Sequence, residues 1–299
     1  MREDLGSVSY THLDVYKRQV LEEKAYAKIN LSLDILSCRE DGYHNLRMVM
    51  QSVTLCDTLE MSRADGILFS CDKAELPAGP GNTVYRAAEL FCRETGVPGV
   101  KIHLKKRIPS QAGLGGGSAD AAAALRGMNR LYGTDLPEKE LRRLGQFVGA
   151  DVPFCVRNGL CLAEGTGELL TPLEKLPACR ILICKPEIGI STGEAFRRAD
   201  VEGRPHNHYT ERVLEALSSG SLSAFGKALG NDFQTVMQIP EVETIREHML
   251  EAGAYGAVMT GSGSAVFGIF PSEGEKASLC AAELKRQFEE TFLCEPIYP

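Results

Sequence analysis

The stretch Ile108–Leu125 reads IPSQAGLGGGSADAAAAL, and its glycines Gly113 and Gly115–Gly117 lie between two regular patterns. Before it, Val100–Ile108 alternates apolar and polar residues, which predicts a β-strand. After it, the alanine-rich stretch Ser118–Leu131 predicts an α-helix. Glycines at such a junction let backbone amides approach a ligand closely, and a helix start adds unpaired N–H donors. The sequence therefore predicts an anion site, suited to a phosphate, at this loop.

The loop matches neither of two common nucleotide-binding patterns. A Walker A sequence, GxxxxGK[ST], is absent, and the pattern GxGxxG fails at Gly113–Ser118. For the loop taken alone, a plain flexible turn therefore stays an alternative to a phosphate site. Ser118 is expected to cap the following helix or to offer its hydroxyl to a phosphate.

The rest of the sequence predicts a mixture of strands and helices without a strict βαβ alternation. We therefore expect an α+β fold in two lobes with a cleft between them. A shift in composition at residues 168–180 predicts a boundary between an N-terminal domain, 20–175, and a C-terminal domain, 176–299. The main predicted strands are Lys24–Leu36, Met48–Met61, Arg180–Cys184 and Ala265–Phe270, and the main predicted helices are Asn82–Glu94 with Asn82 as N-cap, Glu138–Val148, Ser191–Ala199, Glu211–Leu217, Glu241–Ala252 and Ser278–Glu290.

Residues 1–19 differ from everything that follows, because they show no sustained period and carry no motif. The stretch Val8–Gln19 (VSYTHLDVYKRQ) back-translates into DNA that is close to an inverted repeat and looks like two sequencing-library transposon ends joined head to head. Our hypothesis is that this segment is an assembly artefact; the alternative is a natural disordered leader. A protein that begins at Val20 and fails to fold would contradict the hypothesis.

Bulk composition limits the class of protein. A length of 299 residues suits one large domain or two modest ones. The formal charge of -7 disfavours a nucleic-acid partner, and no apolar run is long enough to cross a bilayer. The 10 cysteines form no CxxC pair and no zinc-type cluster with histidine, which indicates free thiols in a reducing cytoplasm.

Three segments resemble the motifs of the GHMP kinases, the superfamily of galactokinase, homoserine kinase, mevalonate kinase and phosphomevalonate kinase. They are Ala27–Ile35 (AKINLSLDI), Ile108–Leu125, and Met259–Phe270 (MTGSGSAVFGIF), and they occur in the family's order. The resemblance implies a two-lobed fold, with an ATP-binding N-terminal lobe like ribosomal protein S5 domain 2 and an α/β C-terminal lobe. It also implies ATP as co-substrate and Mg²⁺ as the accompanying ion.

Two further segments are similar to one branch of this family, whose members act on a cytidine diphosphate compound. They are Asp41–Leu46 (DGYHNL) and Gly149–Phe154 (GADVPF), of which DGYH is distinctive of the branch. The sequence departs from many relatives at Gln111, where they have glycine, and at Ala119, where they have a second serine. Both departures leave the backbone donors of the loop in place.

The resemblance assigns the catalytic roles to two residues. Asp151 is the implied base that takes the proton from the substrate hydroxyl, and Lys28 is the implied cation that stabilises charge during transfer. Asn30 lies two residues on and points to the same strand face as Lys28. Without the other motifs, Asp151 would be interpreted as a helix or turn cap, and Lys28 as a solvated residue on an exposed face.

The remaining implied site residues divide between the two substrates. Tyr43 and His44 are expected to stack on the cytosine and to bond its edge; a solvated turn is the alternative. Phe196 is nearly as consistent with ordinary core packing, and Gly261 with a tight strand turn. The implied ATP site comprises Pro109, Ser110, Gln111, Ala112, Gly113, Leu114, Gly115, Gly116, Gly117, Ser118 and Ala119, with Asn82 and Lys106 near the adenine; the implied acceptor site comprises Asn30, Tyr43, His44, Thr192, Phe196, Gly261 and Ser262.

The resemblance implies phosphorylation of the 2-hydroxyl of a cytidine-diphosphate-linked methylerythritol, in the non-mevalonate route to isoprenoid precursors. A kinase for another alcohol (mevalonate-like, homoserine or a sugar) is the first alternative, and DGYH argues against it. A ligand sensor without turnover is the second alternative, and the presence of Lys28 and Asp151 argues against that. The expected protein is a monomer or homodimer with no nucleic-acid or membrane partner.

Overall fold

The structure is a computed structural model that describes residues 20–203 and 207–299, so the hypothesis about residues 1–19 lies outside the described residues. Its elements in chain order are β1 (Leu21–Cys38), β2 (His44–Arg63), β3 (Ile67–Cys71), α2 (Thr83–Thr95), β4 (Val100–Lys105), α3 (Gly116–Tyr132), α4 (Glu138–Gln146), α5 (Val152–Arg157), β5 (Leu160–Gly165), β6 (Leu169–Pro172), β7 (Cys179–Cys184), α6 (Thr192–Glu202), α7 (Tyr209–Ser218), α8 (Leu222–Ala228), β8 (Gly230–Asn231), α9 (Asp232–Met237), α10 (Pro240–Glu251), β9 (Gly256–Met259), β10 (Val266–Pro271), α11 (Lys276–Leu284) and β11 (Thr291–Cys294).

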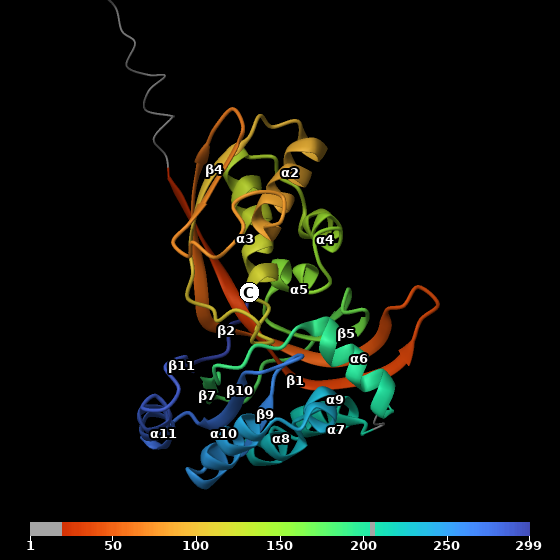
Figure 1. The fold of residues 1–299 in the computed structure, drawn as a ribbon, viewed down its shortest axis with the longest axis vertical. Coiled ribbons are helices and arrows are strands. Elements are labelled where there is room, and N and C mark those ends of the chain that lie inside the picture. The colour runs from red at the N-terminus through yellow and green to blue at the C-terminus, as the bar shows by residue number, and fades with distance from the viewer. Residues whose placement is uncertain (1–19, 204–206) are drawn as a thin grey trace, which may run out of the picture.

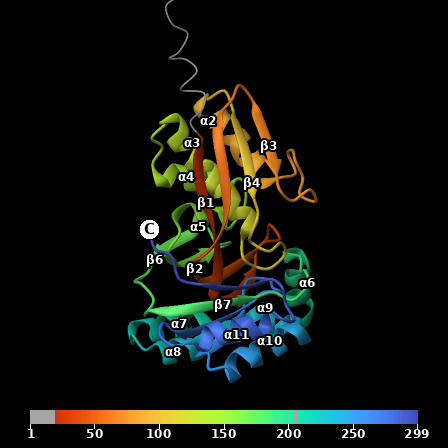
Figure 2. The same ribbon diagram turned by 90° about the vertical axis from the view of Figure 1, so that its left-hand side faces the viewer.

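A seven-stranded sheet forms the first layer, with strand order β3-β4-β2-β1-β8 and with β5 and β6 branching from β2. The long strands β1 and β2 pair antiparallel from Leu21↔Met61 to Cys38↔His44. Helices α2 and α3 pack on one face of this sheet, and Figure 2 shows them behind the strands. This arrangement leaves the loop before α3 at the middle of the molecule, where the two halves meet (Figure 1).

A second, four-stranded sheet has the order β11-β7-β10-β9 and lies with α10 and α11 in the lower half of Figure 1. The two-lobed α+β architecture expected from the sequence is confirmed. The halves are also joined directly, because β8 adds to the first sheet by pairing parallel with β1 at Ser32↔Gly230. The chain end returns to the first sheet as well, where the Ile297 N–H donates to the Ser52 carbonyl at 2.8 Å. The domain boundary between 175 and 176 stays a prediction.

The expected elements around the glycine-rich loop shift by a few residues. Strand β4 ends at Lys105 and not at Ile108, because the N–H groups of Arg107 and Ile108 donate to the side chain of Asp57 and not to a neighbouring strand. Helix α3 begins at Gly116, two residues before the predicted start. Capping of α2 is confirmed, since the side chain of Asn82 accepts from the Val84 N–H. The last helix was predicted too long, because α11 already ends at Leu284.

The cysteines contribute to the core as free thiols. All ten are unpaired, and six of them are buried. Burial raises the pKa of the Cys155 and Cys179 thiols to about 12, which keeps them neutral. In the described part of the chain, every helix is too short or too polar to span a bilayer.

Candidate active site

A cavity of about 970 Å³ opens between the two halves of the molecule. Its walls come from β1 and β2, the glycine-rich loop, the start of α5, helix α6 and the turn after β9. Of the implied site residues, the cavity is lined by Lys28, Asn30, Tyr43, His44, Asn82, Lys106, Pro109, Ser110, Gln111, Ala112, Gly113, Leu114, Gly115, Gly116, Gly117, Ser118, Asp151, Thr192, Phe196, Gly261 and Ser262. One implied residue does not line it: Ala119 is 1% exposed and faces the core, because each helical residue turns by about 100° from the last.

The loop reaches its shape through left-handed backbone angles. Gly113 and Gly115 have φ of 73° and 69°, and Gln111, which replaces a family glycine, also has a positive φ of 52°. At Gly113 a side chain is impossible without movement, because a Cβ there would lie 2.0 Å from the carbonyl oxygen of Thr260. The glycine-rich loop of the second motif is thus in direct backbone contact with the turn of the third motif.

The start of α3 carries unpaired donors toward the cavity. Gly115 is the N-cap residue and has no side chain to accept from the first N–H groups of the helix. Ser118 is therefore not the cap that the sequence suggested; it is the third helical residue, and its side chain lines the cavity. Free N–H groups together with the positive end of the helix dipole make this position suitable for phosphate.

Lys28 and Asp151 meet beside this helix start. Lys28 Nζ lies 3.6 Å from Asp151 Oδ2, and it donates to Asn30 Oδ1 at 2.7 Å. The Lys28 side chain is 5% exposed and that of Asp151 is 30% exposed. Lys28 is thus not a solvated surface residue. Asp151 occupies the N-cap position of α5 but makes no side-chain cap hydrogen bond, which leaves its carboxylate available to a ligand.

Lys28 is fixed on three sides. Its backbone N–H donates to the Leu114 carbonyl at 3.0 Å, which joins β1 to the glycine-rich loop. A Cβ on Gly115 would lie 3.0 Å from Lys28 Cγ, and a Cβ on Gly261 would lie 3.3 Å from its Nζ. The two glycines leave the space that the lysine occupies, so all three motifs converge on one ammonium group.

The residues implied for the cytidine line the same cavity. The rings of His44 and Phe196 are stacked with centroids 4.6 Å apart, and Phe196 meets Phe233 edge-on at 4.9 Å. His44 Nε2 lies 2.9 Å from Asp200 Oδ1. Tyr43 is 63% exposed at the open side. Aromatic rings that line a cavity offer flat faces on which a nucleobase can stack.

Thr192 is the first residue of α6, and its hydroxyl lies 3.2 Å from that of Ser262. This contact joins α6 to the third motif. Asp200 was missed by the sequence reasoning, although it follows Phe196 by four residues and so lies on the same helix face. That spacing is the signal that could have identified it.

The side chains of the two residues implied near the adenine both make hydrogen bonds within the protein. Asn82 accepts from Val84 N–H at 2.9 Å and donates to the Pro77 carbonyl at 3.0 Å. Lys106 Nζ donates to Asp57 and to Asp120. Burial lowers the pKa of Lys106, but the two carboxyl groups outweigh it and the net pKa is raised. Asp120 was not expected in the site; burial raises its pKa to about 8.

Comparison with known proteins agrees with this geometry. The family model described as "GHMP kinases N terminal domain" matches residues 82–159, and the model described as "GHMP kinases C terminal" matches residues 213–290. The chain is 43% identical over 275 residues to a 4-diphosphocytidyl-2-C-methyl-D-erythritol kinase from Caldicellulosiruptor saccharolyticus, covering 90% of this chain and 94% of that protein.

Solved structures give the same result. A crystal structure of 4-(cytidine 5'-diphospho)-2C-methyl-D-erythritol kinase superposes with a TM-score of 0.78 at 33% identity, covering 93% of this chain and all of that one (100%). The mevalonate kinase of Methanococcus jannaschii superposes with a TM-score of 0.74 at 15% identity, covering 94% of this chain and 100% of that chain, which shows the fold alone. The chain therefore belongs to the GHMP kinases, the class of small-molecule kinases that the fold and motifs define. Within that class it belongs to the 4-diphosphocytidyl-2-C-methyl-D-erythritol kinase family.

Proposed function

We propose that the protein transfers the γ-phosphate of ATP to the 2-hydroxyl of 4-diphosphocytidyl-2-C-methyl-D-erythritol, in the non-mevalonate route to isoprenoid precursors. The single observation that carries the proposal is the 3.6 Å pair of Lys28 and Asp151 beside the uncapped start of α3. A cation, a carboxylate and a phosphate site have to be neighbours for an alcohol to be phosphorylated.

In the proposed reaction the carboxylate of Asp151 accepts the proton of the substrate hydroxyl. The hydroxyl oxygen then bonds to the γ-phosphorus while the bond from that phosphorus to the β–γ bridging oxygen breaks, and ADP leaves. Lys28 faces the negative charge that spreads over the transferring group. Its low exposure strengthens this interaction, because little water screens it.

The rest of the cavity supports the choice of acceptor. The cavity that holds the Lys28–Asp151 pair is also lined by the aromatic rings of His44, Phe196 and Tyr43, as a substrate with a nucleobase requires. Asn30 also lines the cavity; its Oδ1 accepts from Lys28 Nζ, and its backbone N–H donates to Thr260 Oγ1 at 2.9 Å. We infer that Asn30 helps to place the methylerythritol hydroxyl.

Mg²⁺ completes the proposal as a companion of ATP. Among the described residues, no three or more His, Cys, Asp or Glu side chains form a group that could hold a metal ion. This fits an ion that keeps phosphate and water oxygens as its ligands, as Mg²⁺ commonly does, with the loop Gly113–Ser118 holding those phosphates. When bound, the ion would neutralise charge on the β- and γ-phosphates. The free thiols favour a cytoplasmic setting, and we propose a monomer or homodimer.

Replacing the proposed base tests the reaction directly. Asp151→Asn keeps the shape of the side chain and removes its basicity, so turnover should fall by about two to four orders of magnitude while ATP binding persists. The assay is ATP consumption with the purified cytidine substrate. Asp65→Asn, at an exposed position before β3, is the matched control and should leave turnover unchanged. Near-normal turnover of Asp151→Asn would remove Asp151 from the mechanism.

A competition assay separates the proposed acceptor from other alcohols. CDP or CTP at high concentration should inhibit a site that binds cytidine, and should leave a mevalonate, homoserine or sugar kinase untouched. An absence of inhibition would contradict the cytidine pocket. An absence of turnover with every acceptor, but with ATP bound, would favour the ligand-sensor alternative.

A further inference from the structure

The chain segment that enters the glycine-rich loop is held by side chains and not by a strand partner. After β4 ends, the N–H groups of Arg107 and Ile108 both donate to Asp57 Oδ1, the latter at 2.8 Å. The N–H of Lys106 donates to Asp72 Oδ1 at 3.0 Å. Three successive backbone donors of the loop entrance are thus bound by two carboxyl groups from β2 and from the turn after β3.

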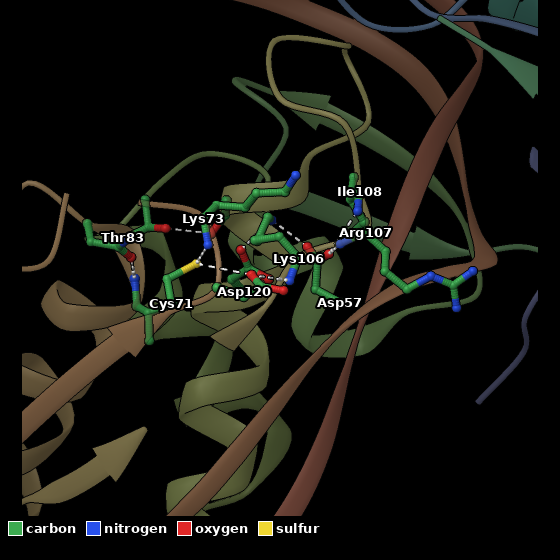
Figure 3. A network of polar contacts seen from close by, with 12 residues as sticks. Asp57, Cys71, Lys73, Thr83, Lys106, Arg107, Ile108 and Asp120 are labelled. Carbon is green, nitrogen blue, oxygen red and sulfur yellow. Dashed lines mark hydrogen bonds and ion pairs between the residues drawn. The ribbon is translucent and has the colours of Figure 1, made fainter. Parts of the chain in front are cut away.

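The ammonium of Lys106 folds back between two buried carboxyl groups (Figure 3). It donates to Asp57 Oδ2 and, at 2.7 Å, to Asp120 Oδ2 on α3. The exposed fractions of the three side chains are 7% for Lys106, 0% for Asp57 and 4% for Asp120. These residues, called here the Asp57–Lys106–Asp120 cluster, connect strand β2, the loop entrance and the phosphate-facing helix.

The cluster also touches the first residue of α3. A Cβ on Gly116 would lie 3.4 Å from Lys106 Nζ and 3.1 Å from Ile108 Cγ2, so the lysine lies directly against the helix start. On the opposite side, Thr83 Oγ1 donates to the Gly117 carbonyl at 2.7 Å. The helix start that faces the phosphates is therefore held from β2 through Lys106 and from α2 through Thr83.

We propose that the Asp57–Lys106–Asp120 cluster is a positioning device for the phosphate site, in which Lys106 acts through the loop and the start of α3 and not by contact with the adenine. This inference rests on the proposed function only in taking the loop as the triphosphate site. It replaces the adenine role that the resemblance implied for Lys106 by a role that is independent of the base.

The placement of the other loop anchors explains why the entrance needs this cluster. The far part of the loop is bound by backbone groups, with Lys28 N–H donating to Leu114 at 3.0 Å and Ala265 N–H donating to Ala112 at 3.2 Å. At the entrance the N–H groups of Lys106, Arg107 and Ile108 donate instead to the side chains of Asp72 and Asp57. Without the cluster, one end of the loop would be fixed and the other would be free to shift, and a shift of about 1 Å is enough to impair binding and transfer.

Burial of the cluster also makes it unfavourable for the Lys106 ammonium to turn toward a bound base. Lys106 Nζ already has two oxygen partners, and releasing it toward a base would leave buried carboxyl groups without their donor, which is costly. Asp120 Oδ1 already lacks a hydrogen-bond donor among the described residues, so the loss of the bond that Asp120 Oδ2 accepts from Lys106 would add to the cost.

The test distinguishes an effect on binding of the phosphates from an effect on binding of the base. Binding of ATP and of inorganic tripolyphosphate, each with Mg²⁺, is measured by titration calorimetry on wild type, Lys106→Met, Asp120→Asn and the double variant. We expect Lys106→Met to raise both dissociation constants by the same factor, about ten-fold or more. In the Asp120→Asn background the same change should cost much less, because the two side chains act through one contact.

Lys105→Met is the matched control. Lys105 precedes Lys106 directly, pairs with Glu60 on the surface, and its side chain is 50% exposed. Its replacement should leave both dissociation constants as in wild type. If Lys106→Met alone does not yield folded protein, the double variant is compared with Asp120→Asn, because it leaves only Asp57 without the ammonium and Asp57 keeps its two backbone donors.

Two results would overturn the proposal. A loss of ATP affinity with unchanged tripolyphosphate affinity would show that Lys106 contacts the base. Equal dissociation constants in wild type and Lys106→Met would show that the cluster does not position the loop. A wild-type protein that binds neither ATP nor tripolyphosphate would instead overturn the proposed function, so the two failures are distinguishable.

Discussion

Replacing Gly113 by alanine tests the contact between the glycine-rich loop and the third motif. A Cβ at Gly113 would lie 2.0 Å from the Thr260 carbonyl oxygen, where 3.4 Å is the lower limit of ordinary contact. Loop and turn therefore have to separate by more than about 1 Å, a shift that costs about a hundred-fold in rate at an active site. We expect kcat/KM for ATP to fall by about that factor.

Gly113→Ala should lower the free energy of unfolding through backbone strain and through overpacking. Gly96→Ala allows the two contributions to be separated. Gly96, the C-cap of α2, has a φ of 75°, close to the 73° of Gly113, but a Cβ there would meet nothing within 4 Å. Gly96→Ala should therefore cost only the left-handed backbone strain, about 1–2 kcal/mol. Gly113→Ala adds overpacking, about 1–3 kcal/mol more, so the total is about 2–5 kcal/mol.

Urea unfolding of both variants and ATP consumption measure these quantities. Gly96→Ala should keep wild-type kcat/KM, because Gly96 does not line the cavity. The reasoning is refuted if the two variants lose the same free energy of unfolding and Gly113→Ala keeps kcat/KM within about two-fold of wild type. That result would mean that the loop and the Thr260 turn are not in contact in the working enzyme.

Three other predictions follow from the site and its surroundings. Lys28→Met should lower kcat by about ten-fold or more with a folded protein, whereas Lys24→Met, exposed on the same strand, should have no effect on turnover. Because burial raises the pKa of Asp120 to about 8 on folding, the folded protein holds a proton that the unfolded chain has lost, so the free energy of unfolding should fall as pH rises toward 8. Urea titrations at pH 6 and pH 8 should show a smaller decrease in the free energy of unfolding for Asp120→Asn than for wild type. In native protein at pH 7, mass spectrometry after iodoacetamide should find the exposed Cys38 alkylated and the buried Cys155 unmodified until denaturant is added, and equal labelling of both would contradict the burial of Cys155.

Lys28 and Lys106 show which contacts the sequence motifs predict and which they do not. Both were assigned through the resemblance, and both line the cavity. The structure brings Lys28 to Asp151, as the resemblance implied, while it gives Lys106 two carboxyl partners that no motif indicated. Asp57 precedes Lys106 by 49 positions, and nothing in its local sequence marks it as a partner.

Three local features of this protein follow from the amino-acid sequence alone: the strand–loop–helix unit around Gly113, the cap of α2 at Asn82, and the order of three motifs. These depend on residue periodicity and on glycine's backbone freedom, which act over a few neighbouring positions. Three other features depend on how distant segments pack: the end of β4 at Lys105, the burial of Ala119, and the one ammonium group that Asp57 and Asp120 share. The register of β2 against β4 and the packing of α3 on the sheet bring these groups together. Such long-range pairings cannot be predicted from the sequence near each residue, because they depend on segments that are far apart in the chain.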